Sequence, residues 1–147
     1  AAVSEPLLNR GTIKCGEANH TLAKPNADGP GSSCRPLSAD RTGLVLDEGA
    51  AMLVLEEWDS ARRRGATILA ELTGYASTTD AHHLTQPDPQ GQARAMQLAL
   101  ADARLNVSDV GYLHAHGTAP DVGDVVETSA IKLACRGAAR KLPDSSG

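Results

Sequence analysis

Phenylalanine is absent from this chain of 147 residues, and Trp58, Tyr75 and Tyr112 are its only aromatic side chains. The core must therefore be built from Leu, Val, Ile and Ala, each of which buries less area than an aromatic side chain does. A domain with such a core has a thin margin of stability. The composition favours a chain whose core is completed by a partner surface.

Long apolar runs, basic blocks and paired cysteines are also lacking. The longest unbroken apolar run is 50–55, whereas a membrane-spanning helix needs about 20 apolar residues. The net charge is −4, and 62–64 is the only basic block, so neither a membrane nor a nucleic acid is an expected partner. No secretory signal is recognisable at the N-terminus, which predicts a cytoplasmic protein. The cysteines are three and widely spaced, which fits neither a disulfide framework nor a CxxC metal site.

Regular patterning begins late in the chain. Residues 1–40 contain many Gly and Pro positions and predict an irregular connecting segment with at most a short helix. The continuous apolar stretch within 44–55 predicts a strand covered on both faces. A short polar helix is expected over 59–64, and the β-rich stretch 67–75 predicts a second strand.

The C-terminal half has the clearest signals. Asp88 provides an N-cap and Pro89 the first helical position of a helix that reaches Ala103. Residues 112–116 predict a strand that stops at Gly117. Strands that alternate with helices predict an α/β fold with a mixed, mainly parallel sheet and flanking helices.

A further helix is expected from Asp124 to Gly137, because Asp124 and Glu127 have the spacing of a capping box. We therefore expect Asp124 to be the N-cap, and both acidic residues to have structural rather than catalytic roles.

Two histidines, His114 and His116, lie on the strand predicted over 112–116. A spacing of two places both on one face, at the end of the strand where α/β proteins bind ligands. Two alternatives remain open. One is a surface histidine beside a core histidine; the other is a metal site that adds the side chains of His82, His83, Asp121 or Asp124, although no zinc signature is present.

Several motifs occur together and in order. Residues 35–50 and the following apolar stretch with Glu56 and Glu57 resemble the "RPFDxxRDGFVxGEGA…VLEE" stretch of β-ketoacyl-acyl carrier protein synthases. Further matches follow at 61–66, 70–75, 80–85, 112–118, 123–128 and 141–143. The resemblance spans roughly 33–146, and the first 32 residues match poorly.

The resemblance implies a thiolase-like fold of two related halves, of which this chain is a central part. Residues 1–40 would connect to it, 41–75 would end the first half and 76–147 would begin the second. The family implies homo-oligomers, an acyl carrier protein with a phosphopantetheine thioester as partner, and no cofactor or metal.

The family catalyses a decarboxylative Claisen condensation in fatty acid or polyketide synthesis. A cysteine holds the acyl group, and two histidines stabilise the negative oxygen as malonyl-carrier protein loses carbon dioxide. By motif position His116 is the first of these histidines, and Thr118 contacts the pantetheine arm. Thr85 and Gln86 correspond to residues at the mouth of the pantetheine channel.

Departures from the family pattern bear on activity. None of Cys15, Cys34 and Cys135 has the setting of the nucleophile, whose segment is expected upstream, and the second histidine and the lysine are expected beyond 141–147. The isolated chain is therefore expected not to condense. A non-catalytic scaffold or dimerisation remnant and a histidine-based metal-dependent hydrolase are the alternative functions.

The motifs themselves are also altered. His114 stands where the family has Asn, Pro120 replaces a pantetheine-contacting hydroxyl, and Asp47 replaces a glycine.

Overall fold

The computed structural model describes residues 1–83, 86–139 and 141–146. Three 3-10 turns accompany the helices and strands, at Pro30–Ser32, Val107–Asp109 and Arg136–Ala138. In chain order the helices and strands are β1 (Ala2–Glu5), α1 (Arg10–Ala18), β2 (Gly49–Met52), α2 (Trp58–Arg63), α3 (Pro89–Ala103), β3 (Leu113–Ala115), α4 (Gly123–Cys135) and β4 (Asp144–Ser146).

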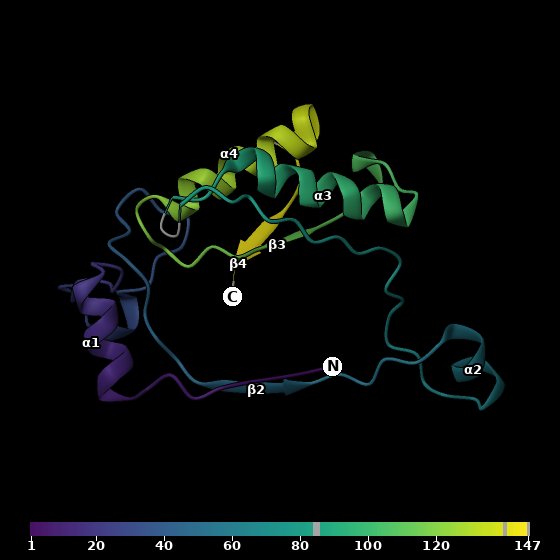
Figure 1. Cartoon of the computed structure of the whole chain (residues 1–147), viewed down its shortest axis with the longest axis horizontal. Helices are drawn as coiled ribbons and strands as arrows, with labels where there is room; N and C mark the ends of the chain where they lie inside the picture. Colours follow the sequence, from purple (N-terminus) through teal and green to yellow (C-terminus); the bar gives the residue numbers. More distant parts are fainter. Residues whose placement is uncertain (84–85, 140, 147) are drawn as a thin grey trace.

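The best-packed part of the chain is the pair of helices α3 and α4 with strands β3 and β4 beside them (Figure 1). α3 begins as expected: the Asp88 side chain accepts hydrogen bonds from the N–H groups of Gln90 and Gly91, with Pro89 in the first turn. The core between the helices consists of small side chains, with Met96 and other aliphatic groups packed around it. Its buried members are Ala93, Ala130, Ala134 and Cys135.

Strand pairing is mixed. β3 pairs with β4 in parallel, with Leu113 opposite Asp144, and β1 pairs with β2 in an antiparallel two-stranded sheet. In Figure 1 the β1–β2 ribbon lies opposite the α3–α4 layer, and long extended segments connect the two. The described strands thus form two small sheets with flanking helices. None of the described helices is long and apolar enough to cross a membrane.

The N-terminal segment is more regular than its sequence predicts. Within 1–40, which was expected to be irregular with at most a short helix, the structure has the short helix α1 and, in addition, strand β1. β1 has no alternating pattern of its own and forms because it pairs with β2. Whether residue 40 marks a domain boundary stays a prediction.

Two strand predictions need correction. β2 was expected to be covered on both faces, but all four of its residues are exposed, because no described element packs on it other than β1 at its edge. Residues 67–75 form no strand. The end of that segment instead lies against α3, where the N–H of Tyr75 donates to the Asp102 carboxylate at 2.9 Å.

The short helix predicted over 59–64 is present as α2, one residue earlier. Its N-cap is Glu57, whose carboxylate accepts hydrogen bonds from the N–H groups of Asp59 and Ser60.

Candidate active site

The turn that carries His116 follows directly from the last residue of β3, Ala115. The next residue, Gly117, has a φ of +37°, and a Cβ atom there would clash with the side chain of Ser146 on β4. Glycine is therefore needed for the chain to leave β3 so close to β4. His116 lies at the carboxyl end of a strand, as expected.

Glu127 on α4 holds this turn. One carboxylate oxygen accepts a hydrogen bond from the His116 N–H at 2.7 Å, and the other accepts one from the Gly117 N–H at 2.8 Å. The predicted capping box is therefore wrong, because both oxygens of Glu127 bind the turn. α4 begins at Gly123, and its N-cap Val122 makes no side-chain bond.

Asp124, expected to be that N-cap, lies inside the first turn of α4 and is only 2% exposed. Its carboxylate accepts hydrogen bonds from the N–H of Ala119 at 3.1 Å and from the N–H of Leu37 at 2.6 Å. The N-cap prediction is wrong because burial gave Asp124 other donors, one of them 87 residues away in sequence. Asp124 thus joins the loop after β3 to the segment near residue 37.

Arg41 strengthens the same junction. Its Nε atom lies 3.8 Å from the Asp124 carboxylate and donates to the carbonyl oxygen of Pro120 at 3.1 Å. A second guanidinium nitrogen donates to the carbonyl oxygen of Asp121 at 2.6 Å. The loop 116–122 is therefore fixed from both sides, by Glu127 and Asp124 on α4 and by Arg41.

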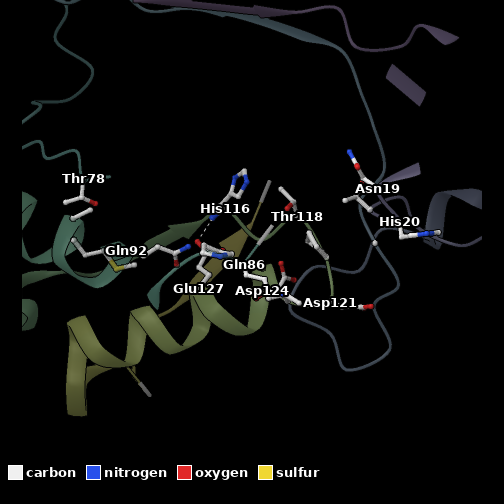
Figure 2. Close-up of a pocket in the computed structure, with 18 of the residues that line it drawn as sticks. Asn19, His20, Thr78, Gln86, Gln92, His116, Thr118, Asp121, Asp124 and Glu127 are labelled. Carbon is white, nitrogen blue, oxygen red and sulfur yellow. Dashed lines mark hydrogen bonds between the residues drawn. The ribbon is translucent and has the colours of Figure 1, made fainter. Parts of the chain in front are cut away.

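A cavity of about 890 Å³ opens beside this loop. Figure 2 shows His116, Thr118 and Gln86 around it, together with Asn19 and His20 from the end of α1. Three of the four predicted site residues are therefore brought together from separate segments. The fourth, Thr85, lies outside the described residues.

The loop that carries Gln86 is anchored by two side chains. The Asp80 carboxylate accepts hydrogen bonds from the N–H groups of Asp88 at 2.8 Å and His82 at 3.1 Å, and these bonds hold the pKa of Asp80 below its usual range. The Nδ1 atom of His82 lies 2.7 Å from the carbonyl oxygen of Gln86. His82, considered above as a metal ligand, thus contacts the backbone of this loop.

Residues 69–146 match the family described as beta-ketoacyl synthase, C-terminal domain. The chain belongs to the β-ketoacyl synthase family. Its sequence is 46% identical to nodulation protein E of Rhizobium sp. (strain N33) over 134 residues, which are 91% of this chain and 32% of that protein. It is 49% identical to 3-oxoacyl-[acyl-carrier-protein] synthase 2 of Staphylococcus aureus over 117 residues, which are 78% of this chain and 29% of that enzyme.

Solved β-ketoacyl synthase structures have the same fold over nearly the whole chain. One from Burkholderia phymatum superimposes with a TM-score of 0.89 at 41% identity, covering 99% of this chain and 35% of its own. Another is a type II polyketide synthase acyl-carrier protein in complex with its ketosynthase bound to the hexaketide, with a TM-score of 0.91 at 35% identity, covering 97% of this chain and 36% of its own. The partial thiolase-like fold is thus confirmed.

The chain spans about a third of the length of the relatives that it matches. Within this chain, however, the resemblance is wider than its motifs indicate, because the 134 matched residues exceed the stretch 33–146. Part of the first 32 residues, which match the family motifs poorly, is therefore included in the matched stretch.

His114, which stands where the family motif has Asn, has other surroundings than His116. His114 and His116 were predicted to share a face, but β3 ends at Ala115 and His114 does not line the cavity. The His114 ring stacks on the Tyr112 ring, with centroids 6.5 Å apart, and its Nδ1 atom lies 3.4 Å from the hydroxyl of Ser145. The described residues contain no group of three or more side chains that could hold a metal ion.

None of the three cysteines lines the cavity. Cys15 and Cys34 are exposed elsewhere, while Cys135 is buried between α3 and α4, where burial raises the pKa of its thiol. A raised pKa lowers the fraction of the nucleophilic thiolate at neutral pH.

Several cavity residues were missed by reasoning from the sequence. Asn19 and His20 lie in a segment without motifs, so no signal pointed to them. Gln92 was missed because the sequence of its helix indicates only a cap and a face of core-packing residues. Arg41 and Asp124 are far apart in the sequence, so their contact could not be predicted from it either.

Proposed function

We propose that this chain forms the histidine- and threonine-bearing wall of a ketosynthase site that condenses an acyl thioester with malonyl-carrier protein. The observation that carries the proposal is the convergence of His116, Thr118 and Gln86 on one cavity. These are the positions to which the family motifs assign the catalytic histidine and the pantetheine contacts. Thr85, outside the described residues, is assigned to the pantetheine channel by its motif position alone.

His116 would act on the malonyl thioester. The bond between C2 of the malonyl group and its carboxylate breaks, carbon dioxide leaves, and the electron pair forms an enolate at the thioester oxygen. An imidazole N–H directed at that oxygen stabilises the developing charge. The enolate carbon then attacks the carbonyl carbon of the acyl thioester, whose carbon–sulfur bond breaks to release the thiolate.

Fixed backbone around His116 is what such a role needs, because a donor that is already oriented costs no reorganisation during the reaction. The bonds from His116 and Gly117 to Glu127 supply this orientation. The hydroxyl of Thr118, two residues on, would contact the pantetheine arm of the carrier protein.

The partner that this proposal implies is an acyl carrier protein with a phosphopantetheine thioester. Support comes from the polyketide synthase neighbour, whose ketosynthase is in complex with its acyl-carrier protein. The proposal further includes homo-oligomers and a cytoplasmic location. It also divides the chain, with 41–75 as the end of one thiolase-like half and 76–147 as the start of the next.

A chimera tests the function. The 117 residues of this chain that match the Staphylococcus aureus synthase replace the matched segment of that enzyme, and the condensation of an acyl thioester with malonyl-carrier protein is measured. We expect activity, and we expect His116→Ala to lower the rate by about a hundredfold or more. The matched control is His114→Ala, a neighbouring histidine outside the cavity, which should retain most of the activity.

Equal losses in the two histidine variants, or an active His116→Ala chimera, would contradict the proposal. Circular dichroism of each chimera checks that the variants remain folded. Neither the scaffold nor the metal-dependent hydrolase is favoured by any observation, since the similar proteins are condensing enzymes by name.

A further inference from the structure

Gln92 lies in the wall of the cavity, near the start of α3 (Figure 2). Its neighbours on the same wall are Ala95 and Met96, one helical turn further on. Apart from Gln92, this stretch of the α3 wall is therefore apolar. Gln92 is a polar interruption on a helix whose remaining inward residues build the aliphatic core with α4.

The amide oxygen of Gln92 is buried and has no hydrogen-bond partner among the residues that the structure describes. More than nine in ten buried polar groups in proteins have such a partner, so an orphaned acceptor requires an explanation. Its burial without a partner opposes folding, whereas Met or Leu at this position would pack without that cost. Gln92 is therefore not explained by the stability of the helix pair.

Two polar side chains near Gln92, Thr78 and Glu127, are already engaged. The hydroxyl of Thr78 donates to the carbonyl oxygen of Gly91 at 2.9 Å, and the Glu127 carboxylate accepts the two N–H groups of the His116 turn. Among the described residues no side chain donates to Gln92, so its acceptor is open to a molecule bound in the cavity. The residue as a whole is only half-buried, and the last torsion of a glutamine side chain is soft, so its oxygen can turn to the cavity surface.

We propose that Gln92 is a specificity-determining residue that accepts a hydrogen bond from an N–H or O–H group of the thioester substrate. The inference rests on the proposed function, since it takes an acyl thioester as the occupant of the cavity. Two parts of such a substrate carry donors: the pantetheine arm, with its amide N–H and hydroxyl groups, and the acyl part where it bears a hydroxyl group. A simple thioester of a saturated acid has neither.

Calorimetric titration of the full chain with three ligands separates these sources. Butyryl-pantetheine has amide and hydroxyl donors on its arm, S-ethyl 3-hydroxythiobutyrate has a hydroxyl donor on its acyl part, and S-ethyl thiobutyrate has none. We expect Gln92→Met to weaken the binding of at least one donor-bearing ligand by about tenfold, and to leave any binding of S-ethyl thiobutyrate unchanged. The ligand that loses affinity identifies the source of the donor.

Thermal unfolding distinguishes this role from a structural one. Because Gln92→Met removes an orphaned acceptor, the Tm of the ligand-free variant should equal or exceed that of the parent chain. Gln97→Met, at an exposed position of the same helix, is the matched control and should change neither the Tm nor any affinity.

Unchanged affinity of Gln92→Met for both donor-bearing ligands overturns the inference, as does a lower Tm with equal weakening for all three ligands. A parent chain that binds neither donor-bearing ligand overturns it as well. The proposed function is decided separately, by the condensation rate of the chimera and its histidine variants.

Discussion

The carboxylate of Glu127 accepts a hydrogen bond at 2.7 Å from the backbone N–H of His116, eleven residues earlier in the chain. A second bond, from the Gly117 N–H, uses the other carboxylate oxygen. One acidic side chain on α4 thus fixes the backbone of the turn that carries the candidate catalytic imidazole. This relationship gives the first of five predictions.

Glu127→Gln should destabilise the chain and loosen the turn. A neutral amide has a single acceptor oxygen, so its NH₂ group would face one backbone N–H and leave that donor unpaired. Hydrogen bonds to charged groups contribute about 1.5–3 kcal/mol each, so we expect a loss of about 2 kcal/mol in the free energy of unfolding. Urea denaturation measures the loss, and amide hydrogen exchange at His116 and Gly117 should accelerate. Glu71→Gln, at an exposed position, is the control; equal losses in the two variants would refute the role of Glu127.

Asp124→Ala should lower the free energy of unfolding by more than the loss of a helix cap does. Replacing an N-cap costs about 1 kcal/mol, but removal of this buried carboxylate leaves the N–H of Ala119 without its partner and Arg41 without its counter-charge. We expect a loss of about 3 kcal/mol in denaturant unfolding. The control is Asp121→Ala: the side chain of Asp121 is exposed on the same loop, so its removal should lower the free energy of unfolding much less. A loss of only 1 kcal/mol for Asp124→Ala would support a simple cap after all.

No cysteine of the isolated chain should take up an acyl group. Cys15 and Cys34 are exposed away from the cavity, and burial raises the pKa of Cys135, which lowers its thiolate fraction at neutral pH. Incubation with radiolabelled acyl-carrier protein should leave the chain unlabelled, with no condensation product. Label that disappears when one of the three cysteines is changed to Ala would overturn this expectation. Alkylation at pH 7 should modify Cys15 and Cys34 before Cys135.

The isolated chain should self-associate. Val54 is 86% exposed and Leu69 is 92% exposed, and both lie in a segment that no described element covers. Large uncovered apolar surfaces drive association. Sedimentation velocity should detect species larger than the monomer, and the double variant Val54→Lys, Leu69→Lys should shift the distribution toward the monomer without lowering the melting temperature. A monodisperse monomer with a sharp cooperative melt would argue against this prediction.

The loop that carries Gln86 should loosen in acid. The backbone N–H groups of Asp88 and His82 hold the pKa of Asp80 below its ordinary value of about 3.9. Because the pKa of Asp80 is lower in the folded chain than in the unfolded chain, its ionised carboxylate stabilises the fold. This stabilisation is fully present above the ordinary pKa and is lost as the pH falls through the pKa of the folded chain. Hydrogen exchange of the Asp88 and His82 amides, compared at equal intrinsic rates, should therefore show protection that declines below pH 4. Asp80→Asn should have weaker protection at neutral pH and no such acid-dependent step.

The sequence by itself determined the features that depend on local chemistry. Asp88 and Pro89 place a cap and a helical start at adjacent positions, so α3 could be predicted with its N-cap. The strand around Leu113 could be predicted from the stretch 112–116, which stops at Gly117, although β3 itself ends at Ala115 and His116 follows it. The family could be identified because its motifs lie within short, continuous stretches.

The tertiary structure alone decided which partners the polar side chains take. Asp124 and Glu127 have capping-box spacing, but their carboxylates bind the N–H groups of Leu37, Ala119, His116 and Gly117. A buried carboxylate must satisfy its oxygens with the donors that folding brings near, and sequence spacing does not record those donors. The same holds for the edge pairing that forms β1, for the irregular backbone of 67–75, and for the amide oxygen of Gln92, which has no partner among the described residues.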